Sequence, residues 1–384
     1  MDFNFSEEQK LIAETVRDFA TNRLEPVAEK MDKEDYWPAD LFRELGELGL
    51  LGPTIEERYG GAESDYFTQT IILEELAKVS PAFALSVGAH SNLMMDNLSR
   101  NGTEEQKSKY LPKLVTGEYT GALCLTEPGS GSDALGMKTT ATLHGDFYHL
   151  NGSKTFITNA PIADVGIVYA KTSPNKGKGG ITAFVLELNS DGVTRGKKME
   201  KMGMRGSLTG ELFFDDVKVP ADNIMGEVDQ GQKIVMSGLS AERATLAGIS
   251  LGISEAVSQM ALNYSLEREQ FDQKIANFQM IQDKLANMYV ESMASKLLVY
   301  YAVSKLKENH RVNREPAASI YYAAEKSTKL ALDAIQILGG YGYMKEYKVE
   351  KFMRDAKLLE IGAGTSEIRK LIIARDLIRT GDFS

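Results

Sequence analysis

The chain has 384 residues, of which 43% are hydrophobic and 26% charged, and its formal net charge at pH 7 is −10. This length suits two or three domains with substantial cores, and the acidic balance argues against nucleic acid or an anionic membrane as a partner. The single cysteine, Cys124, excludes an intramolecular disulfide framework, and four histidines without a Cys/His cluster predict no transition-metal site.

The N-terminus is acidic and has neither a basic region nor an apolar run of the kind that marks an export signal. We therefore expect a cytoplasmic bacterial protein, or a mitochondrial matrix protein if the chain is a processed eukaryotic one. No stretch of about 18 apolar residues predicts a membrane-spanning helix.

Residues 1–119 are predicted to form a helical domain. Ser6 and Gln9 make a capping-box pattern at the start of the first helix. Further helices are expected over 64–78 and 103–114, and the apolar stretch 80–90 predicts a buried helix between them.

Residues 120–226 have the pattern of a β-domain. Strands are expected over 121–127, 165–170, 181–186 and 211–220. The stretch 147–158 holds Asn151-Gly152 between apolar residues, which predicts a hairpin turn at that point.

Residues 227–384 return to a helical pattern. Ala331, Ala334, Ile335 and Leu338 share one helical face, and Gly339-Gly340 follows as a stop signal. The fold class is therefore predicted as α+β, with a helical domain on either side of a β-domain.

Four stretches are candidates for ligand binding. Residues 123–133 begin as a strand and become a Gly/Ser-rich loop, which suits the polar edge of a heterocycle or a phosphate, or is a plain turn. Phe156 and Thr158 lie two residues apart and share one strand face, either to flank a planar cofactor or as ordinary strand residues. The loops 336–343 and 361–369 are helix caps or anion sites, and no G-x-G-x-x-G pattern supports a Rossmann site.

The stretch Ser237–Gly248 is built of small and apolar residues around two charges, Glu242 and Arg243. Its composition predicts burial, and burial raises the pKa of a carboxylate. A carboxylate of that kind is suited to act as a general base. A structural ion pair or a solvated helix face are the alternatives.

Five ordered motifs give these pieces a common context: L-T-E-P-G-S-G-S-D (125–133), F-I-T-N (156–159), R-E-Q-F-D-Q-K (268–274), Q-x-x-G-G (336–340) and G-T-S-E-I-R (364–369). With them the chain resembles the acyl-CoA dehydrogenase family from end to end. The resemblance implies a helical domain over 1–119, a central β-domain over 120–226 and a four-helix bundle domain over 227–384. It also implies FAD as cofactor, electron-transferring flavoprotein as electron acceptor and a homotetramer.

The position of the catalytic base separates branches of the family. Most members carry it as the Glu of a Y-E-G-T motif, but this chain has Ala363 there. Isovaleryl- and long-chain-type members place the base instead on the helix with L-x-x-E-R, which points to Glu242. The chain resembles the isovaleryl-CoA dehydrogenase branch most, in the stretches 88–93, 100–114, 203–207, 236–243 and 360–367. The implied reaction is α,β-dehydrogenation of a short-chain branched acyl-CoA to the enoyl-CoA, with hydride transfer to flavin N5.

Alternatives to this activity stay open. One is a different acyl group, alicyclic such as cyclohexane-1-carboxyl-CoA or another short or medium chain. Asp96, in the expected acyl-pocket segment 93–96, supports that reading if it lies near the acyl group. The alternative is that its carboxylate is solvated or capped. A flavin oxidase on the same fold and a helical assembly protein without flavin are the other two.

The resemblance also assigns site residues. Glu242 is the catalytic base, and its backbone N–H, with the flavin ribityl 2′-OH, is expected to donate to the thioester carbonyl. The other residues expected near the substrate are Ser132, Leu239, Arg243, Ala363 and Gly364. The residues expected to bind the cofactor are Leu123, Leu125, Thr126, Gly131, Ser132, Phe156, Ile157, Thr158, Arg268, Phe271, Gln279, Gln336, Ile337, Gly339, Gly340, Thr365, Ser366 and Glu367.

Overall fold

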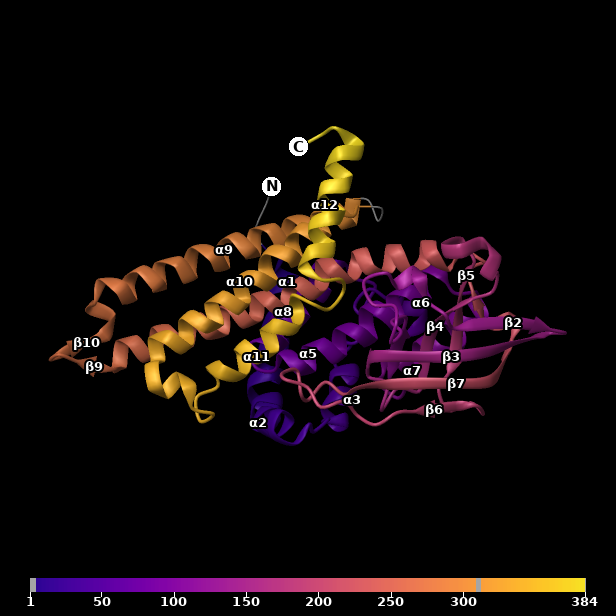
Figure 1. Ribbon diagram of the computed structural model, residues 1–384. Coiled ribbons are helices and arrows are strands. Elements are labelled where there is room, and N and C mark those ends of the chain that lie inside the picture. The colour runs from indigo at the N-terminus through magenta and orange to yellow at the C-terminus, as the bar shows by residue number, and fades with distance from the viewer. Residues whose placement is uncertain (1–4, 309–311, 384) are drawn as a thin grey trace.

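The structure is a computed structural model, and it describes residues 5–308 and 312–383. Helices occupy both ends of the chain and a β-sheet the middle (Figure 1). This order confirms the predicted succession of helical, β and helical parts. The limits 1–119, 120–226 and 227–384 remain our proposed domain boundaries. Across the described residues, no helix combines the length and apolar character needed to cross a bilayer.

The N-terminal part is a compact set of helices. The capping box of Ser6 and Gln9 is formed, with both hydrogen bonds in place at 3.0 and 3.1 Å. The helices are α1 (Glu7–Phe19), α2 (Glu25–Glu34), α3 (Ala39–Glu47), α4 (Tyr66–Ala77), α5 (Pro81–Gly88), α6 (Asn97–Asn101) and α7 (Glu104–Val115).

A π-helical turn, Ala89–Asp96, joins α5 to α6 without a break. All residues of α5 are buried, which confirms the predicted buried helix over 80–90. Turns of this wider kind are uncommon and are frequent at functional sites. This one faces the first half of α8, described below.

The β-domain contains one sheet of eight strands in the described chain. The order is β6-β7-β3-β2-β4-β5-β8, and β1 pairs in parallel with β4. The strands are β1 (Gly121–Cys124), β2 (Thr140–His144), β3 (Phe147–Thr158), β4 (Val165–Lys171), β5 (Ile181–Glu187), β6 (Val193–Arg195), β7 (Thr209–Pro220) and β8 (Ile224–Met225).

The hairpin predicted at Asn151-Gly152 is wrong. Phe147–Thr158 is one continuous strand, and the turn lies earlier, at Gly145 and Asp146 between β2 and β3. Asn151 and Gly152 form an irregularity where the pairing with β7 shifts register. The side chain of Asn151 accepts the backbone N–H of Asp216 at 2.9 Å. The tertiary pairing with β7 has therefore overridden the local turn signal.

The C-terminal part is a bundle of long helices. Its helices are α8 (Gly231–Glu267), α9 (Gln279–Glu308), α10 (Arg314–Leu338), α11 (Val349–Leu359) and α12 (Ser366–Thr380). The helices α8, α9 and α10 run side by side, and α12 projects from the middle of the bundle (Figure 1). A small hairpin, β9 (Glu269–Gln270) and β10 (Gln273–Lys274), joins α8 to α9 at the end of the molecule farthest from the sheet (Figure 1).

Helix α8 packs closely on α4 of the N-terminal part. At Gly248, an added Cβ would lie 2.7 Å from the carbonyl oxygen of Thr70. That distance is inside van der Waals contact and faces backbone, which cannot rotate away. A glycine at this position lets the two helix axes approach, and it fixes how α8 lies against the N-terminal domain.

We therefore expect Gly248→Ala to destabilise the fold by about 1–3 kcal/mol, because the two helices must separate. Urea unfolding measures the change. Gly88→Ala is the control: it is also a buried helical glycine, but the nearest atoms to an added Cβ would be side-chain atoms of Leu73 and Leu246, at 3.4 Å or more. Equal destabilisation by both substitutions would show that close backbone approach at Gly248 is not the cause.

Candidate functional site

Glu242 is a buried carboxylate in the interior of α8. Only 8% of the residue is exposed, and the neighbours Ala241, Arg243 and Ala244 are buried as well. This confirms the burial predicted from the small and apolar residues around it. No hydrogen bond to its carboxylate is found among residues 5–308 and 312–383.

Burial raises the pKa of Glu242 to about 7, and the nearby charges of Arg243 and Arg369 partly oppose that rise. A carboxyl group with a pKa near neutrality can both accept and release a proton under physiological conditions. The electrostatics therefore suit a general base better than a structural ion pair.

Two arginines hold the loop between α11 and α12 beside Glu242. Arg243 Nε donates to the carbonyl of Ala363 at 3.0 Å, and Arg369 Nη2 donates to the carbonyl of Gly362 at 2.5 Å. Arg369 is fully buried, yet its Nε and Nη1 have no hydrogen-bond partner within the described chain. Burial lowers the pKa of Arg369 to about 10, so it stays cationic at pH 7.

Ala363 has a left-handed backbone conformation, with φ of 56°. It is half-buried, and in the described residues its backbone N–H makes no hydrogen bond. The backbone N–H of Glu242, by contrast, lies inside α8, where each N–H bonds the carbonyl four residues earlier. The expectation that the Glu242 N–H donates to a thioester carbonyl is therefore wrong, and Ala363 has the available donor.

Glu242 faces the segment between Asn92 and Asn97. Gly238, Glu242 and Thr245 lie four and three residues apart, so they share one face of α8. The side-chain amide of Asn92 donates to the hydroxyl of Thr245. At the other end, an added Cβ on Gly238 would collide with the side chain of Asn97. These two contacts bracket Glu242.

Within that segment the side chains differ in exposure. Leu93 is half-buried, whereas Met94 and Met95 are fully buried. Met94 packs under β1, because its Cγ lies where a Cβ of Gly121 would be. Leu93 is therefore the one apolar side chain of residues 93–95 that is partly accessible.

Asp96 is buried and paired. It is 3% exposed, and its two oxygens accept from the Tyr66 hydroxyl at 2.9 Å and from Arg100 Nε at 2.8 Å. Arg100 also donates to Ser237 of α8 at 3.3 Å. Asp96 is therefore not solvated, but its carboxylate is satisfied by hydrogen bonds inside the fold, as the reading of a capped side chain expects.

The Gly/Ser-rich loop after β1 and the end of β3 lie together. The N–H of Thr155 donates to the carbonyl of Thr126 at 2.9 Å, which joins the two segments. Gly131 and Ser132 are exposed, and an added Cβ on Gly131 would meet nothing within 4 Å. Leu123 and Thr126 are half-buried and Leu125 is buried.

Phe156 is a strongly exposed aromatic residue of this region. Its side chain is 68% exposed and its φ is 57°, at a point where the pairing of β3 with β7 again shifts register. Ile157, the next residue, is buried, and Thr158 after it is half-buried. A left-handed backbone conformation at a residue other than glycine costs free energy, and such residues are typical of functional positions.

The start of α12 carries the third predicted group. Thr365 caps the helix by accepting the N–H of Ile368 at 3.3 Å, as predicted. Glu367 is exposed, but Ser366 is buried, and its hydroxyl has no hydrogen-bond partner among the described residues. An added Cβ on Gly364 would lie 3.5 Å from the guanidinium of Arg243. The start of α12 therefore adjoins the part of α8 that carries Glu242.

The remaining predicted residues gather elsewhere, at the far end of the bundle. Arg268 and the Ile337–Gly340 turn line a hollow of about 470 Å³ together with Tyr264, Gln270, Ile275, Tyr341 and Met344. Added Cβ atoms on Gly339 and Gly340 would meet nothing within 4 Å, so a ligand has access to their backbone. Phe271, Gln279 and Gln336 are exposed near this end.

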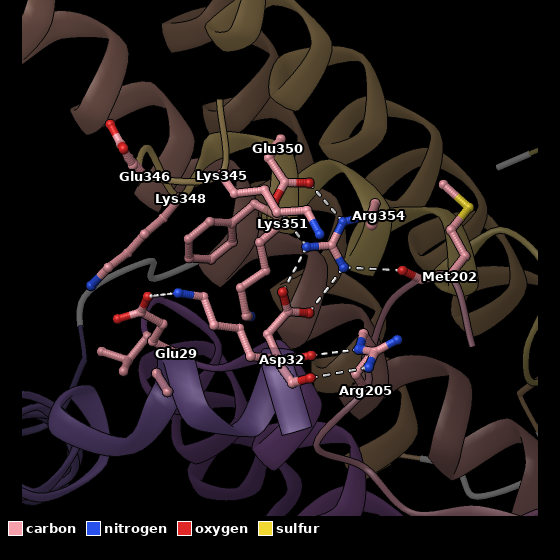
Figure 2. Close-up of a pocket in the computed structure, with 14 residues that line it drawn as sticks. Glu29, Asp32, Met202, Arg205, Lys345, Glu346, Lys348, Glu350, Lys351 and Arg354 are labelled. Atoms are coloured by element: carbon pink, nitrogen blue, oxygen red, sulfur yellow. Dashed lines mark hydrogen bonds and ion pairs between the residues drawn. The ribbon is translucent and has the colours of Figure 1, made fainter. Parts of the chain in front are cut away.

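A second hollow, of about 400 Å³, lies between α2, the loop before β7 and α11 (Figure 2). Figure 2 shows Arg354 between Asp32 and Glu350, and it donates to both at 2.7 Å. Arg205 donates to the carbonyl of Asp32 from the β-domain side. Arg354 thus pairs with carboxylates of this hollow, and none of the predicted site residues lines it, so we read it as a junction between domains.

The sequence analysis missed three buried charged residues near the predicted sites: Arg369 beside Glu242, and Lys154 and Glu127 beside the Gly/Ser-rich loop. Arg369 stood inside the quoted G-T-S-E-I-R motif, and its burial was the missing information. Lys154 and Glu127 form a fully internal ion pair at 2.9 Å. Their 27-residue separation gives no local signal, although a charged residue between apolar strand residues was a hint.

Comparisons with known proteins match nearly the whole chain to one family. The chain matches three family models in order: the N-terminal domain of acyl-CoA dehydrogenase over 6–118, its middle domain over 122–217 and its C-terminal domain over 229–378. Mitochondrial isovaleryl-CoA dehydrogenase of Pongo abelii is 46% identical over 374 residues, which cover 96% of this chain and 88% of that protein.

Solved structures show the same fold. Butyryl-CoA dehydrogenase from Megasphaera elsdenii superposes with a TM-score of 0.97 at 41% identity, covering 99% of this chain and 100% of that one. A glutaryl-CoA dehydrogenase in complex with glutaryl-CoA gives a TM-score of 0.95 at 39% identity, covering 99% and 97%. The three matched domains, at this identity and coverage, make the chain an enzyme of the acyl-CoA dehydrogenase family.

Proposed function

We propose that this enzyme dehydrogenates a short-chain branched acyl-CoA, similar to isovaleryl-CoA, and that Glu242 removes the α-proton. The observation that carries the proposal is the state of Glu242: buried, without a hydrogen-bond donor in the described chain, and with its pKa raised to about 7. The family's other base position holds Ala363, which has no acidic side chain.

The residues around Glu242 have complementary tasks in this proposal. The backbone N–H of Ala363 donates to the thioester carbonyl, where negative charge develops as the α-proton leaves. Arg243 and Arg369 fix the 362–363 loop through its carbonyl groups, so they hold that donor in position. Leu239 precedes Glu242 by one helical turn, and Gly364 lies beside the Arg243 guanidinium, so we propose that both residues contact the thioester.

We propose FAD as the cofactor, and the residues present fit it. Phe156 offers an exposed ring beside Thr158, and the Ser366 hydroxyl is buried without a partner in the described residues. Gly131 leaves its backbone open for a polar ring edge or a phosphate. Bound FAD would accept the β-hydrogen as hydride.

We further propose that the enzyme is a homotetramer in which each flavin contacts two chains. Arg268, Gln279 and the Gln336–Gly340 turn lie at the far end of the bundle, away from the sheet that carries Phe156 (Figure 1). A second copy would bring these residues to the flavin. The exposed apolar side chains of α9 support such packing: Met280, Tyr289, Val290, Met293 and Leu297.

The side chains opposite Glu242 favour an apolar acyl group. Leu93 is the half-buried residue of the bracketed segment, and Asp96 is compensated by Arg100 and Tyr66. The segment between Asn92 and Asn97 therefore offers an apolar side chain and no uncompensated charge, which disfavours a dicarboxylic acyl chain such as glutaryl.

A turnover screen tests the substrate. Isovaleryl, isobutyryl, butyryl, octanoyl, glutaryl and cyclohexane-1-carboxyl thioesters are compared with an artificial electron acceptor, and we expect the highest kcat/KM for isovaleryl-CoA. Preference for the cyclohexane or a straight-chain thioester would move the enzyme to the alternative substrate. Electron-transferring flavoprotein is the proposed acceptor, so its reduction should outpace oxygen consumption, and the reverse result would indicate an oxidase.

The pH profile tests the electrostatics of the base. Removing the cation in Arg369→Met is expected to raise the pKa of Glu242, because Arg369 now lowers it. A base works only when ionised, so the rise of kcat/KM with pH should move up by about one unit. Arg379→Met, which removes an exposed arginine of the same helix, should leave the profile in place. An unshifted profile in Arg369→Met would contradict the coupling.

A further inference from the structure

The β-domain contains a buried ion pair next to the proposed flavin site. Lys154 of β3 is fully buried, and its Nζ donates to Glu127 Oε1 at 2.9 Å and to the carbonyl of Leu125 at 3.0 Å. Glu127 is 6% exposed. One lysine of the strand therefore holds two points at the start of the Gly/Ser-rich loop.

Glu127 also makes hydrogen bonds to the residues that follow the loop. Its carboxylate accepts the backbone N–H groups of Lys138 at 2.5 Å and of Thr139 at 3.0 Å. Burial would raise the pKa of Glu127, but the charge of Lys154 and these hydrogen bonds outweigh it and hold the pKa below its usual value. Glu127 is thus an anion that ties together the residues before and after the loop.

The pair lies between the two segments that the flavin would contact. Phe156 follows Lys154 by two residues, and Thr158 by four, with a register shift of β3 between Lys154 and Ile157. On the loop side, Gly131 and Ser132 stand between the two attachment points. Movement of the loop relative to β3 would therefore change the width of the site.

An ion pair is a poor choice for stability alone. Well-packed apolar residues of similar volume often stabilise a core as well or better, because they avoid desolvating two charges. The polar pair instead satisfies one carbonyl and two N–H groups of an irregular loop at once, which apolar side chains cannot do.

We infer that Lys154 and Glu127 are positioning residues that hold the Leu125–Asp133 loop at a fixed place against the end of β3, so that loop and strand form one preorganised flavin site. The inference rests on the proposed FAD-dependent function. It assigns neither residue a contact with the reacting atoms.

The test measures flavin binding directly. In Lys154→Met/Glu127→Gln the charges are removed together, so that no unpaired charge stays buried. We expect the apoprotein to fold, and the FAD dissociation constant, measured by fluorescence titration, to rise at least about tenfold. The absorption spectrum of the flavin that remains bound should move toward that of free FAD.

A second buried pair supplies the control. Lys351 and Asp355 of α11 lie 2.7 Å apart, both are buried, and Asp355 also accepts a backbone N–H, from Met204. Lys351→Met/Asp355→Asn should change thermal stability but not the FAD dissociation constant.

The outcomes separate the inference from the proposed function. Unchanged FAD affinity and spectrum in the Lys154/Glu127 variant, or an equal loss in the Lys351/Asp355 control, would overturn the positioning role while FAD binding by the wild type stands. If the wild-type apoprotein itself binds no FAD, the proposed function fails, and the inference fails with it.

Discussion

Replacing Glu242 with Gln is expected to lower kcat for acyl-CoA dehydrogenation by about 10³–10⁴-fold, because the amide cannot accept the α-proton. Single-turnover flavin reduction under anaerobic conditions measures the loss without interference from the electron acceptor. Binding of FAD and of the CoA thioester should persist, since Gln has nearly the same size. Turnover near the wild-type rate would remove Glu242 from its proposed role.

The same substitution should stabilise the protein at high pH. The folded pKa of about 7 lies above the ordinary value of 4.5, so the stability that Glu242 contributes is fully present below pH 4.5 and is lost as the pH rises through 7. Gln has no such loss. We expect Glu242→Gln to gain about 3 kcal/mol at pH 9 and almost nothing at pH 4, measured by urea unfolding of the apoprotein.

Removing Asp96 is expected to have the largest effect on stability. In Asp96→Ala, the buried Tyr66 and the half-buried Arg100 lose their shared acceptor, and breaking a largely buried pair from one side costs about 3–5 kcal/mol. Asp96→Ala/Arg100→Met should recover part of the loss, because it also removes the unpaired cation. Chemical unfolding of the three proteins measures the difference.

An exposed pair with the same helical spacing is the control for Asp96. Glu29 and Lys33 also lie four residues apart, but both side chains are more than half exposed. Glu29→Ala should therefore cost no more than about 0.5 kcal/mol. A similar small cost for Asp96→Ala would mean that the Tyr66–Asp96–Arg100 cluster does not support the segment opposite Glu242.

Local patterns in the sequence were sufficient for the architecture. Helical periodicity located α10 up to its glycine stop, and the small residues around Glu242 correctly indicated its burial. Thr365 behaves as the predicted helix cap. Each of these features is determined by residues within one or two helical turns, which is why the sequence alone reveals them.

Features that depend on distant partners escaped prediction. The Asn151-Gly152 pair has the composition of a turn, but pairing with β7 keeps it within a strand. Lys154 finds Glu127 only when β3 lies against the loop after β1. The resemblance assigned the thioester donor to the backbone N–H of Glu242 although it also placed that residue on a helix, and the helix uses that N–H.

The length of α8 has a genetic consequence. Glu242 lies in α8 and Arg268 directly follows its last residue, so the two stand about 39 Å apart along the helix axis. If Arg268 serves the flavin of a neighbouring chain, a chain with Glu242→Gln and a chain with Arg268→Ala are each inactive alone. Co-expressed, they should complement each other, because a mixed assembly combines an intact base from one chain with an intact arginine from the other.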